Sequence, residues 1–296
     1  MSAAADGFVL LVNRAAGSSE DAVVDQVALL LRTAGHEVEI RACGQPDDVD
    51  DVVAAVGDRT LVVCGGDGSL HLAVGRLRAA GRLDVPVGLI PLGTGNDFAR
   101  AVDIPLEDPE GAVGHLLAGA TRPIDLLVGN DDRACVNALH IGLGATAAAR
   151  ADAMKDSLDD LAYPLGAILA GLTEGGTRMR VEVDGAVVAD GPTLLVAVCN
   201  GTGFGGGARI APDADPADGL LDVVVVQATG PVARAAFGVA LQRGTHLERD
   251  DVVLVRGRRV TIDGDDLRDD VDGELGEPGA AAREWQVDPG AWRFVG

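Results

Sequence analysis

Apolar and polar positions in the first third of the chain follow an alternation of strand and helix. Residues 8–12 form a continuous apolar run, which is typical of a buried strand, and residues 20–35 repeat apolar side chains at helical spacing. The pattern then predicts a strand at 37–41 and a helix at 48–56. Because strands that alternate with helices form parallel sheets with right-handed crossovers, we expect a doubly wound α/β domain.

A strand at 60–63 and another at 85–90 continue this alternation, with a helix at 70–81 between them. Each of these two strands leads into a glycine-rich loop that carries an aspartate: CGGDGSL at 64–70 and PLGTGNDF at 91–98. Because the carboxyl ends of parallel strands meet at one edge, we expect both loops to border one crevice, where such folds bind phosphorylated ligands. Glycine lets backbone N–H groups approach anionic oxygens, and a helix that starts after the loop adds its positive end.

The pattern changes near Pro123, beyond which short extended runs predominate. We expect helices at 146–172, with a break near Pro164, and at 231–244, and a last extended segment at 285–292. The other runs predict strands at 124–129, 134–140, 178–183, 193–199, 220–226, 252–256 and 259–262. The chain is therefore expected to combine an α/β domain at 1–123 with a β-rich, sandwich-like domain at 124–284.

Together, the two glycine loops resemble those of a known family. GGDG followed by Ser69, and PLGTGNDFAR at 91–100, are similar to motifs in the catalytic domain of the diacylglycerol kinase family of lipid kinases. The first motif alone is shared with NAD kinases. Further segments match the family at 13–17, 200–207, 211–223 and 272–274, so the resemblance covers nearly the whole chain. It implies an NAD kinase/diacylglycerol kinase-like fold, in which residues 285–296 return to the first, nucleotide-binding domain and the second domain binds the lipid.

The resemblance implies ATP and Mg²⁺ as ligands of the first domain. Backbone N–H groups of Gly66, Gly68 and Ser69 would face the phosphates, and Asp67 would help to position the metal. One carboxylate is enough, because Mg²⁺ keeps several of its waters. The expected nucleotide-binding residues are Asn13, Gly17, Cys43, Gly65, Gly66, Asp67, Gly68, Ser69, Leu70, His71, Leu72, Gly93, Thr94, Asn96 and Asp97.

Some of these positions carry an alternative or depart from the family pattern. Asp97 fits an N-cap for a helix at 98–102 as well as it fits a direct catalytic role. Cys43 stands where the family often has a threonine, so a hydroxyl contact is lost. His71 and Leu72 replace an asparagine and a glutamate, and we expect an ordinary helix-surface histidine and a packing leucine.

Phosphoryl transfer also needs a base for the acceptor hydroxyl. Glu274 matches the family residue with that role, and Asp272 lies two positions before it. In an extended chain such residues project to the same face, so both carboxylates are expected to point into the cleft with Asp67. From the residues alone, the acidic surroundings at 263–270 favour a solvated run. The flanking resemblance favours the catalytic interpretation.

A second divalent site is implied by the resemblance, away from the chemistry. Asp215, Asp218 and the backbone carbonyl of Leu220 match its ligands. An Asx-rich turn before the strand at 220–226 is an equally good interpretation.

Charge and composition limit the partners. The chain carries a net charge of −22, which excludes nucleic acid as a natural partner and argues against electrostatic adhesion to anionic lipid. We therefore expect any contact with the membrane surface to be brief, and from the cysteines and the first residues we expect a cytoplasmic protein. The four cysteines lack metal-ligand spacing, the first residues lack the features of a signal peptide, and the apolar stretch at 161–172 is too short to span a bilayer.

Three functions remain open from the sequence. The first is an ATP- and Mg²⁺-dependent lipid kinase that phosphorylates a hydroxyl of a lipid such as diacylglycerol. The second is an NAD kinase-like phosphotransferase, against which the motif at 91–100 argues. The third is a nucleotide-binding regulatory protein without catalysis, against which the retention of Asp67, Asp272 and Glu274 argues. The identity of the lipid stays open, and the resemblance allows a homodimer.

Overall fold

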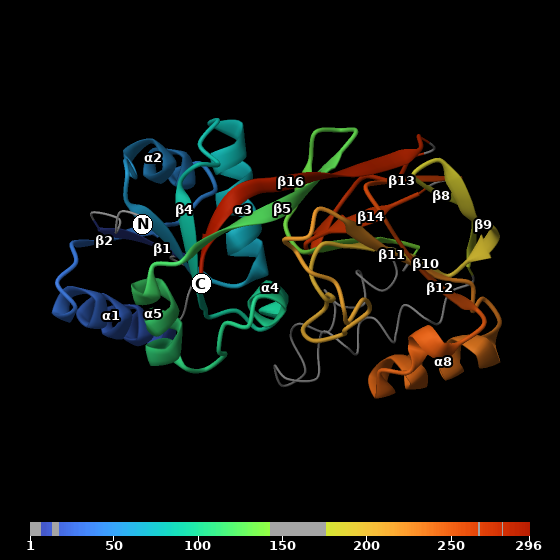
Figure 1. The fold of residues 1–296 in the computed structure, drawn as a ribbon, viewed down its shortest axis with the longest axis horizontal. Helices are drawn as coiled ribbons and strands as arrows, with labels where there is room; N and C mark the ends of the chain where they lie inside the picture. Colours follow the sequence, from blue (N-terminus) through green and yellow to red (C-terminus); the bar gives the residue numbers. More distant parts are fainter. Residues whose placement is uncertain (1–6, 14–17, 143–175, 266, 280) are drawn as a thin grey trace.

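The computed structural model describes residues 7–13, 18–142, 176–265, 267–279 and 281–296. They form two halves that lie side by side, bridged by two long strands, β5 (Thr121–Gly129) and β16 (Arg283–Val295) (Figure 1). The predicted helix at 146–172 and the expected nucleotide ligand Gly17 lie outside the described residues.

In the first half, strands and helices alternate along the chain, as predicted. The strands β1, β2, β3 and β4 form a parallel array in the order β2-β1-β3-β4. Helices α1 and α5 pack together on one face, and α2 and α3 pack together on the other (Figure 1). The elements are β1 (Phe8–Asn13), α1 (Ser18–Thr33), β2 (Val38–Cys43), α2 (Asp48–Ala55), β3 (Thr60–Gly65), α3 (Asp67–Ala79), β4 (Pro86–Pro91), α4 (Asp97–Ala101) and α5 (Pro109–Ala118). The doubly wound parallel sheet is thus confirmed.

Strand register brings the predicted loops to one edge of this sheet. Asn13 at the end of β1 pairs with Cys43 at the end of β2. Gly65 at the end of β3 pairs with Pro91 at the end of β4. The chain segments that follow all four strands therefore leave the sheet on the same side.

The described residues of the second half form a six-stranded sheet, part of a second sheet that packs against it, and the helix α8 (Pro231–Arg243). The elements after β5 are β6 (Ala134–Cys135), β7 (Ala138–Ile141), β8 (Thr177–Val183), β9 (Ala186–Thr193), β10 (Leu195–Cys199), β11 (Leu221–Val226), α8 (Pro231–Arg243), a 3₁₀ turn (His246–Glu248), β12 (Val252–Gly257), β13 (Arg259–Gly264), β14 (Asp269–Val271), β15 (Glu274–Leu275) and β16. An antiparallel six-stranded sheet has the order β12-β11-β10-β7-β14-β15. This confirms the expected β-rich half.

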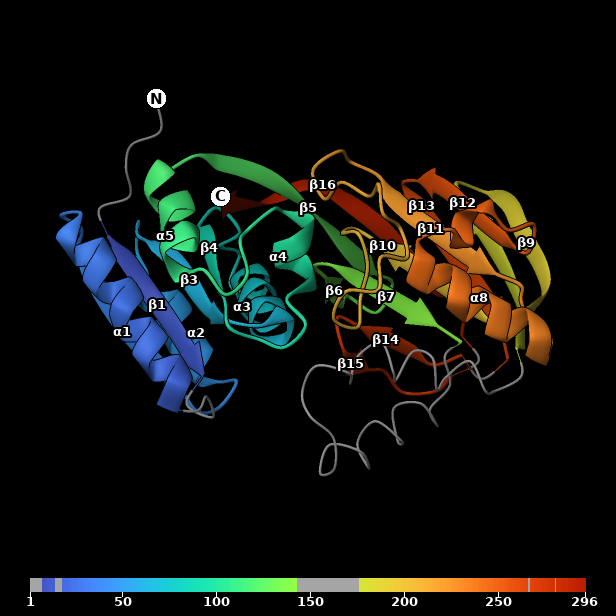
Figure 2. The same ribbon diagram turned by 90° about the horizontal axis from the view of Figure 1, so that it is seen from below.

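Alternating side chains explain why the six-stranded sheet is buried on both faces. Val196 and Val198 of β10 pack into the core between the two sheets. Leu195 and Ala197 point the other way, into a separate core under α8 that includes Phe237. The continuous apolar runs of β10 and β11 thus satisfy two hydrophobic layers at once, and Figure 2 shows α8 lying across the outer layer.

The second sheet is shared by both halves. Its strand order is β2-β1-β3-β4-β16-β13-β8-β9. Arg293 and Phe294 of β16 run parallel to β4, whereas residues 283–286 pair antiparallel with β13. β5 follows β16 along its length, with a bulge between Asp288 and Trp292. The predicted extended segment at 285–292 is thus confirmed as the middle of a longer strand.

Several element predictions were wrong in detail. Helix α3 begins at Asp67, three residues before the predicted start, because the glycine loop itself forms the first turn. The strand expected at 134–140 is broken into β6 and β7, and Thr193 belongs to β9 rather than to the next strand. Helix α5, strand β9 and the β14–β15 hairpin were not predicted.

Candidate active site

The two glycine loops touch each other backbone to backbone. A Cβ atom added to Gly93 would lie 2.4 Å from the Cα of Gly66, and one added to Gly66 would lie 2.9 Å from the Cα of Gly93. The Leu92 N–H also donates to the Gly65 carbonyl oxygen at 3.1 Å. Only glycine allows this approach, so the pair of loops forms one surface, as the sequence predicted.

The amino end of α3 opens at this surface. Its N-cap is Gly66, in an extended conformation, which has no side chain to cap the helix. The first N–H groups of a helix lack intrahelical partners, and together with the helix dipole they favour anions. A Cβ on Gly68 would meet nothing within 4 Å, and both Gly68 and Ser69 are accessible. The first turn of α3 is therefore well suited to bind phosphate oxygens.

Asp67 joins the first loop to the second. Its carboxylate accepts the N–H groups of Asp97 and Phe98, both at 3.0 Å, and so caps the amino end of α4. Burial raises the pKa of Asp67; these two hydrogen bonds oppose that shift, and the negative charges of Asp97 and Asp272 add to it. An ionised Asp67 is thus crowded by like charge and favours a nearby cation.

Asn96 and Asp97 shape the second loop. Asn96 has a left-handed backbone, φ 51°, and its side-chain oxygen accepts the Gly93 N–H at 3.0 Å. The buried carboxylate of Asp97 accepts the N–H groups of Gly206 and Gly207, each at 2.7 Å, so it clamps the second half of the chain. The helix expected at 98–102 begins at Asp97, but the carboxylate that caps it belongs to Asp67.

Thr94 is exposed at the tip of the same loop. It lies between Gly93, which contacts the first loop, and Gly95, whose added Cβ would lie 2.9 Å from the Asp67 carboxylate. A hydroxyl at this place is accessible to a ligand that occupies the crevice.

Asp272 holds the chain of the second half in place. Its carboxylate accepts backbone N–H groups of Val136 at 2.6 Å, Asn137 at 2.9 Å and Ala138 at 3.0 Å. The side chain is only 1% exposed. Asp272 is therefore an anchor whose oxygens are already occupied, rather than a free base.

The geometry expected for Asp272 and Glu274 was wrong. Asp272 (φ 50°) and Gly273 (φ 93°) form a two-residue turn between β14 and β15, so the segment is a hairpin and not an extended chain. As a result, Asp272 is buried while the Glu274 side chain is 69% exposed. Glu274 remains accessible to a substrate.

His71 lies between these two carboxylates. Its Nδ1 is 2.8 Å from Asp272 Oδ2, and its Nε2 is 3.7 Å from Glu274 Oε2. The expectation of an ordinary helix-surface histidine was wrong, because the imidazole is only 16% exposed and bridges the two halves. The available sequence signal was its position one helical turn after Asp67, which places the two side chains on the same face of α3.

A small cavity adjoins the crevice at the ends of β1 and β2. It has a volume of about 160 Å³ and brings together four predicted nucleotide ligands. These are Asn13, Cys43, Ser69 and Leu72. Leu72 also packs against the core of the first half, as expected. The cavity walls are mostly apolar, which suits a flat ring better than a phosphate.

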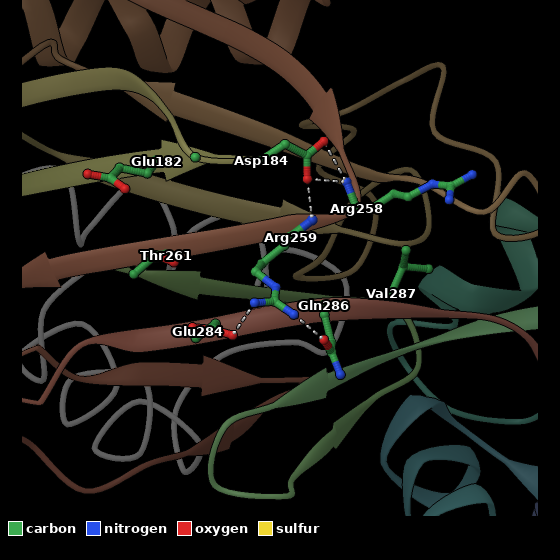
Figure 3. Close-up of a pocket in the computed structure, with 9 residues that line it drawn as sticks. Glu182, Asp184, Arg258, Arg259, Thr261, Glu284, Gln286 and Val287 are labelled. Atoms are coloured by element: carbon green, nitrogen blue, oxygen red, sulfur yellow. Dashed lines mark hydrogen bonds and ion pairs between the residues drawn. The ribbon is translucent and has the colours of Figure 1, made fainter.

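A larger cavity, with a volume of about 540 Å³, is lined by none of the predicted ligands (Figure 3). Asp184 accepts the backbone N–H groups of Arg258 and Arg259, and the Arg259 guanidinium contacts Glu284 at 3.3 Å and Gln286 at 3.1 Å. Carboxylates thus pair with two arginines of the basic cluster at 256–259: Glu284 with Arg259, and Asp218 with Arg256. No residue of the two glycine loops lines this cavity.

Mg²⁺ could bind beside Asp67 only if the phosphates of a nucleotide supplied most of its ligands. Among the described residues, no group of three or more His, Cys, Asp or Glu side chains could hold a metal ion. Asp67 is partly exposed, and its carboxylate uses two acceptor positions of about four. A single carboxylate of this kind can hold Mg²⁺ directly or through water when phosphates supply the other oxygens.

The second divalent site is not supported. Asp215 accepts the Ala217 N–H and Asp218 accepts the Leu220 N–H, both at 3.0 Å, so the segment forms the Asx turns of the alternative interpretation. The Arg256 guanidinium pairs with Asp218 and lies 3.3 Å from Asp222. A cationic side chain stands beside the Asp218 carboxylate that a metal would need, so the structure favours the Asx turn over a divalent site at Asp215, Asp218 and Leu220.

Comparisons with known proteins agree with this geometry. Residues 7–128 match the diacylglycerol kinase catalytic domain, and residues 137–296 match the YegS C-terminal NAD kinase beta sandwich-like domain. The chain is 30% identical over 275 residues to a diacylglycerol kinase of Mycobacterium tuberculosis, covering 88% of this chain and 86% of that protein. It is 33% identical over 267 residues to a Xanthomonas campestris protein named "Probable lipid kinase YegS-like", covering 84% and 82%.

Solved structures show the same fold. A diacylglycerol kinase of Bacillus anthracis superimposes with a TM-score of 0.79 at 21% identity, covering 100% of this chain and 98% of the other. An NAD kinase of Archaeoglobus fulgidus superimposes with a TM-score of 0.56 at 13% identity, covering 98% and 93%.

Proposed function

We propose a function from one premise, which is that the chain belongs to the diacylglycerol kinase family and is a phosphotransferase with an alcohol acceptor. The proposed reaction transfers the γ-phosphate of ATP, with Mg²⁺, to a hydroxyl of a lipid such as diacylglycerol. In this proposal residues 1–123 hold the nucleotide, residues 124–284 hold the lipid, and residues 285–296 return to the nucleotide half.

The observation that carries the proposal is the single surface formed by the two glycine loops at the open end of α3. Gly66 and Gly93 are in contact, the first turn of α3 presents N–H groups, and an apolar cavity lies beside it at the ends of β1 and β2. An anion-binding helix end next to a small apolar cavity suits a nucleotide, whose base is apolar and whose phosphates are charged.

Glu274 is the proposed base. The oxygen of the acceptor hydroxyl attacks the γ-phosphorus as the bond to ADP breaks, and the hydroxyl proton passes to the Glu274 carboxylate. An exposed carboxylate on β15, at the edge of its sheet, is accessible to a bulky acceptor. The neighbouring Asp272 cannot share this role, because its oxygens accept three backbone N–H groups.

Mg²⁺, when bound, neutralises charge on the phosphates. Asp67 is the residue proposed to hold it, at the junction of the two loops. Backbone N–H groups of the α3 first turn and the exposed Thr94 are proposed to orient the phosphate chain.

A lipid acceptor agrees with the surroundings of Glu274. The adjacent Leu275 is 42% exposed, so an apolar side chain stands beside the proposed base. Within the part of the chain that the structure describes, no helix is both long enough and apolar enough to cross a membrane. We propose a cytoplasmic enzyme that meets its lipid at the membrane surface only transiently. A homodimer stays a prediction of the family resemblance.

Labelled ATP, Mg²⁺ and mixed micelles of several lipid alcohols test the proposal, with NAD added as a competing acceptor. Label in an organic-extractable lipid would support it and identify the lipid class. Label in NAD would instead indicate an NAD kinase. ATP binding without transfer to any acceptor would favour a regulatory protein.

A further inference from the structure

His71 connects an occupied carboxylate to a free one. Asp272 is buried and held by three backbone N–H groups, whereas Glu274 is exposed, and among the described residues its carboxylate makes no hydrogen bond or ion pair except that with His71. The imidazole lies on α3, in the first half of the chain, and both carboxylates lie on the β14–β15 hairpin of the second half. One side chain of the first half thus contacts both carboxylates of the hairpin.

The proton positions on the imidazole follow from its partners. Asp272 accepts backbone hydrogen bonds on both oxygens, so it acts as an acceptor toward His71 too. The Nδ1 atom, at 2.8 Å, must therefore carry a proton and donate it to Asp272. The Nε2 atom is left facing Glu274, where a second proton would place a positive charge 3.7 Å from the carboxylate.

We propose that His71 is a positioning residue whose imidazolium, fixed by Asp272, holds the Glu274 carboxylate in place and directed toward the phosphate-binding turn. This inference rests on the proposed function in one respect, which is that Glu274 is the base. It adds a residue that acts through the base without touching the substrate.

The charges around His71 favour the imidazolium. Asp272 and Glu274 face it from the hairpin, and Arg133 faces it from the segment before β6. Burial lowers the pKa of His71, but the hydrogen bond and charge of Asp272 and the charge of Glu274 outweigh burial and the nearby Arg133, so the pKa is raised. The positive form is therefore favoured at a higher pH than in an ordinary histidine.

A pH dependence follows. The Glu274 carboxylate would be held in place while His71 is protonated, and it would lose its counter-charge as the pH rises through the raised pKa of His71. The rate of transfer should accordingly show an alkaline limb that depends on His71. A side chain that only fixes the hairpin would give no such limb.

Two variants separate the roles of the two ring nitrogens. In His71→Asn the amide nitrogen can take the place of Nδ1 and donate to Asp272, but nothing faces Glu274. In His71→Ala both contacts are lost. His115→Asn, on the distant helix α5, is the matched control. Steady-state kinetics over a pH series, with thermal melting of each variant, are the measurements.

We expect His71→Asn to keep the melting temperature and the KM for ATP, to lower kcat about 10- to 100-fold, as small misplacements of catalytic groups do, and to lack the alkaline limb. His115→Asn should match the wild type. The inference is overturned if His71→Asn keeps the wild-type kcat and the wild-type pH profile. The hydrogen bond to Asp272 would then be enough for full activity, and the contact with Glu274 would have no role.

A measurement without turnover keeps this inference separate from the proposed function. The imidazole signals of His71, assigned in NMR spectra by comparison with His71→Asn, should titrate at a higher pH than those of a free histidine. The titration should move to lower pH in Glu274→Gln. If the protein phosphorylates no lipid but this shift is seen, the contact stands and the function fails; if the shift is absent, the positioning role fails whatever the substrate.

Discussion

Gly66 and Gly93 come from different loops, yet each occupies the space that a side chain on the other would need. This contact fixes the distance between the first turn of α3 and the loop that leads into α4. It also explains how two glycine-rich loops separated by a helix and a strand form one surface.

Gly93→Ala should separate the loops. Its Cβ would lie 2.4 Å from backbone, which cannot rotate away as a side chain does, so we expect a loss of about 1–3 kcal/mol in the free energy of unfolding and a large loss of ATP affinity. Urea unfolding and calorimetric titration with ATP measure both. Gly75→Ala, in the interior of α3 with no atom within 4 Å, should instead gain about 0.5–1 kcal/mol. Equal behaviour of the two variants would contradict the argument.

Gly68→Ala should affect binding without affecting the fold. A Cβ there meets no protein atom within 4 Å and lies in the first turn of a helix, so the free energy of unfolding should stay the same or rise. ATP affinity should fall, because the methyl group would occupy the space in which phosphate approaches the backbone. Unchanged affinity for ATP would mean that the phosphates bind elsewhere.

Glu274→Gln should remove the base and leave nucleotide binding intact. General base catalysis contributes about 10²- to 10⁴-fold, so kcat should fall by that order while the Kd for ATP stays constant. Glu277→Gln, an exposed glutamate three residues further on, is the control and should keep its activity. Wild-type turnover in the Glu274 variant would show that another group takes the proton.

Stability should depend on pH through Asp67. Its pKa is raised in the folded protein, so between the unfolded value near 3.8 and the raised value the folded state binds more protons. This contribution is fully present below the unfolded pKa and is lost as the pH rises through the folded pKa. Urea unfolding from about pH 4 to about pH 8 should therefore show a shallower pH dependence in Asp67→Asn than in the wild type or in Asp58→Asn, a surface control.

Arg256 should make the second half independent of divalent ions. Calcium or magnesium without nucleotide should leave the melting temperature of the wild type unchanged, because Arg256 already neutralises Asp218 and the buried Asp222. Arg256→Gln should cost about 1–3 kcal/mol, less than a fully buried pair because the arginine is partly exposed, and a divalent ion should restore part of it. Arg180→Gln, which breaks an exposed pair, is the control. A metal-dependent rise in the wild type would contradict this assignment.

The features that the sequence predicted best depend on residues that are close in sequence. The apolar runs predicted the parallel strands, and the glycines at 65–68 and 93–95 predicted that the two loops meet, because strand ends and their loops are local properties. Helix α5 was not predicted, because two glycines interrupt its apolar pattern. Its start is nevertheless marked by Pro109 and by Asp108, whose carboxylate accepts the Gly111 N–H and caps the helix. The hairpin of β14 and β15 was not predicted, because the acidic residues around it indicated a solvated run. Its turn, Asp272–Gly273, is nevertheless of a type that such hairpins favour.

The contacts of the site that the sequence did not predict are made between residues that are distant in sequence. His71 and Asp272 are 201 positions apart, and the Asp97 carboxylate meets Gly206, 109 positions away. Neither periodicity nor spacing reports such contacts. The same holds for Arg256, whose position beside Asp218 decides between a metal site and a turn.

Strand β16 has a consequence for how the protein is made. It lies between β4 and β13 in the shared sheet, so both strands keep an open edge until β16 has been synthesised. A nascent chain that reaches only residue 282 would hold the shared sheet in two separate pieces. We therefore expect neither half to reach its final structure before β16 is synthesised, and removal of β16 to leave a chain that chaperones and proteases recognise as unfolded in both halves.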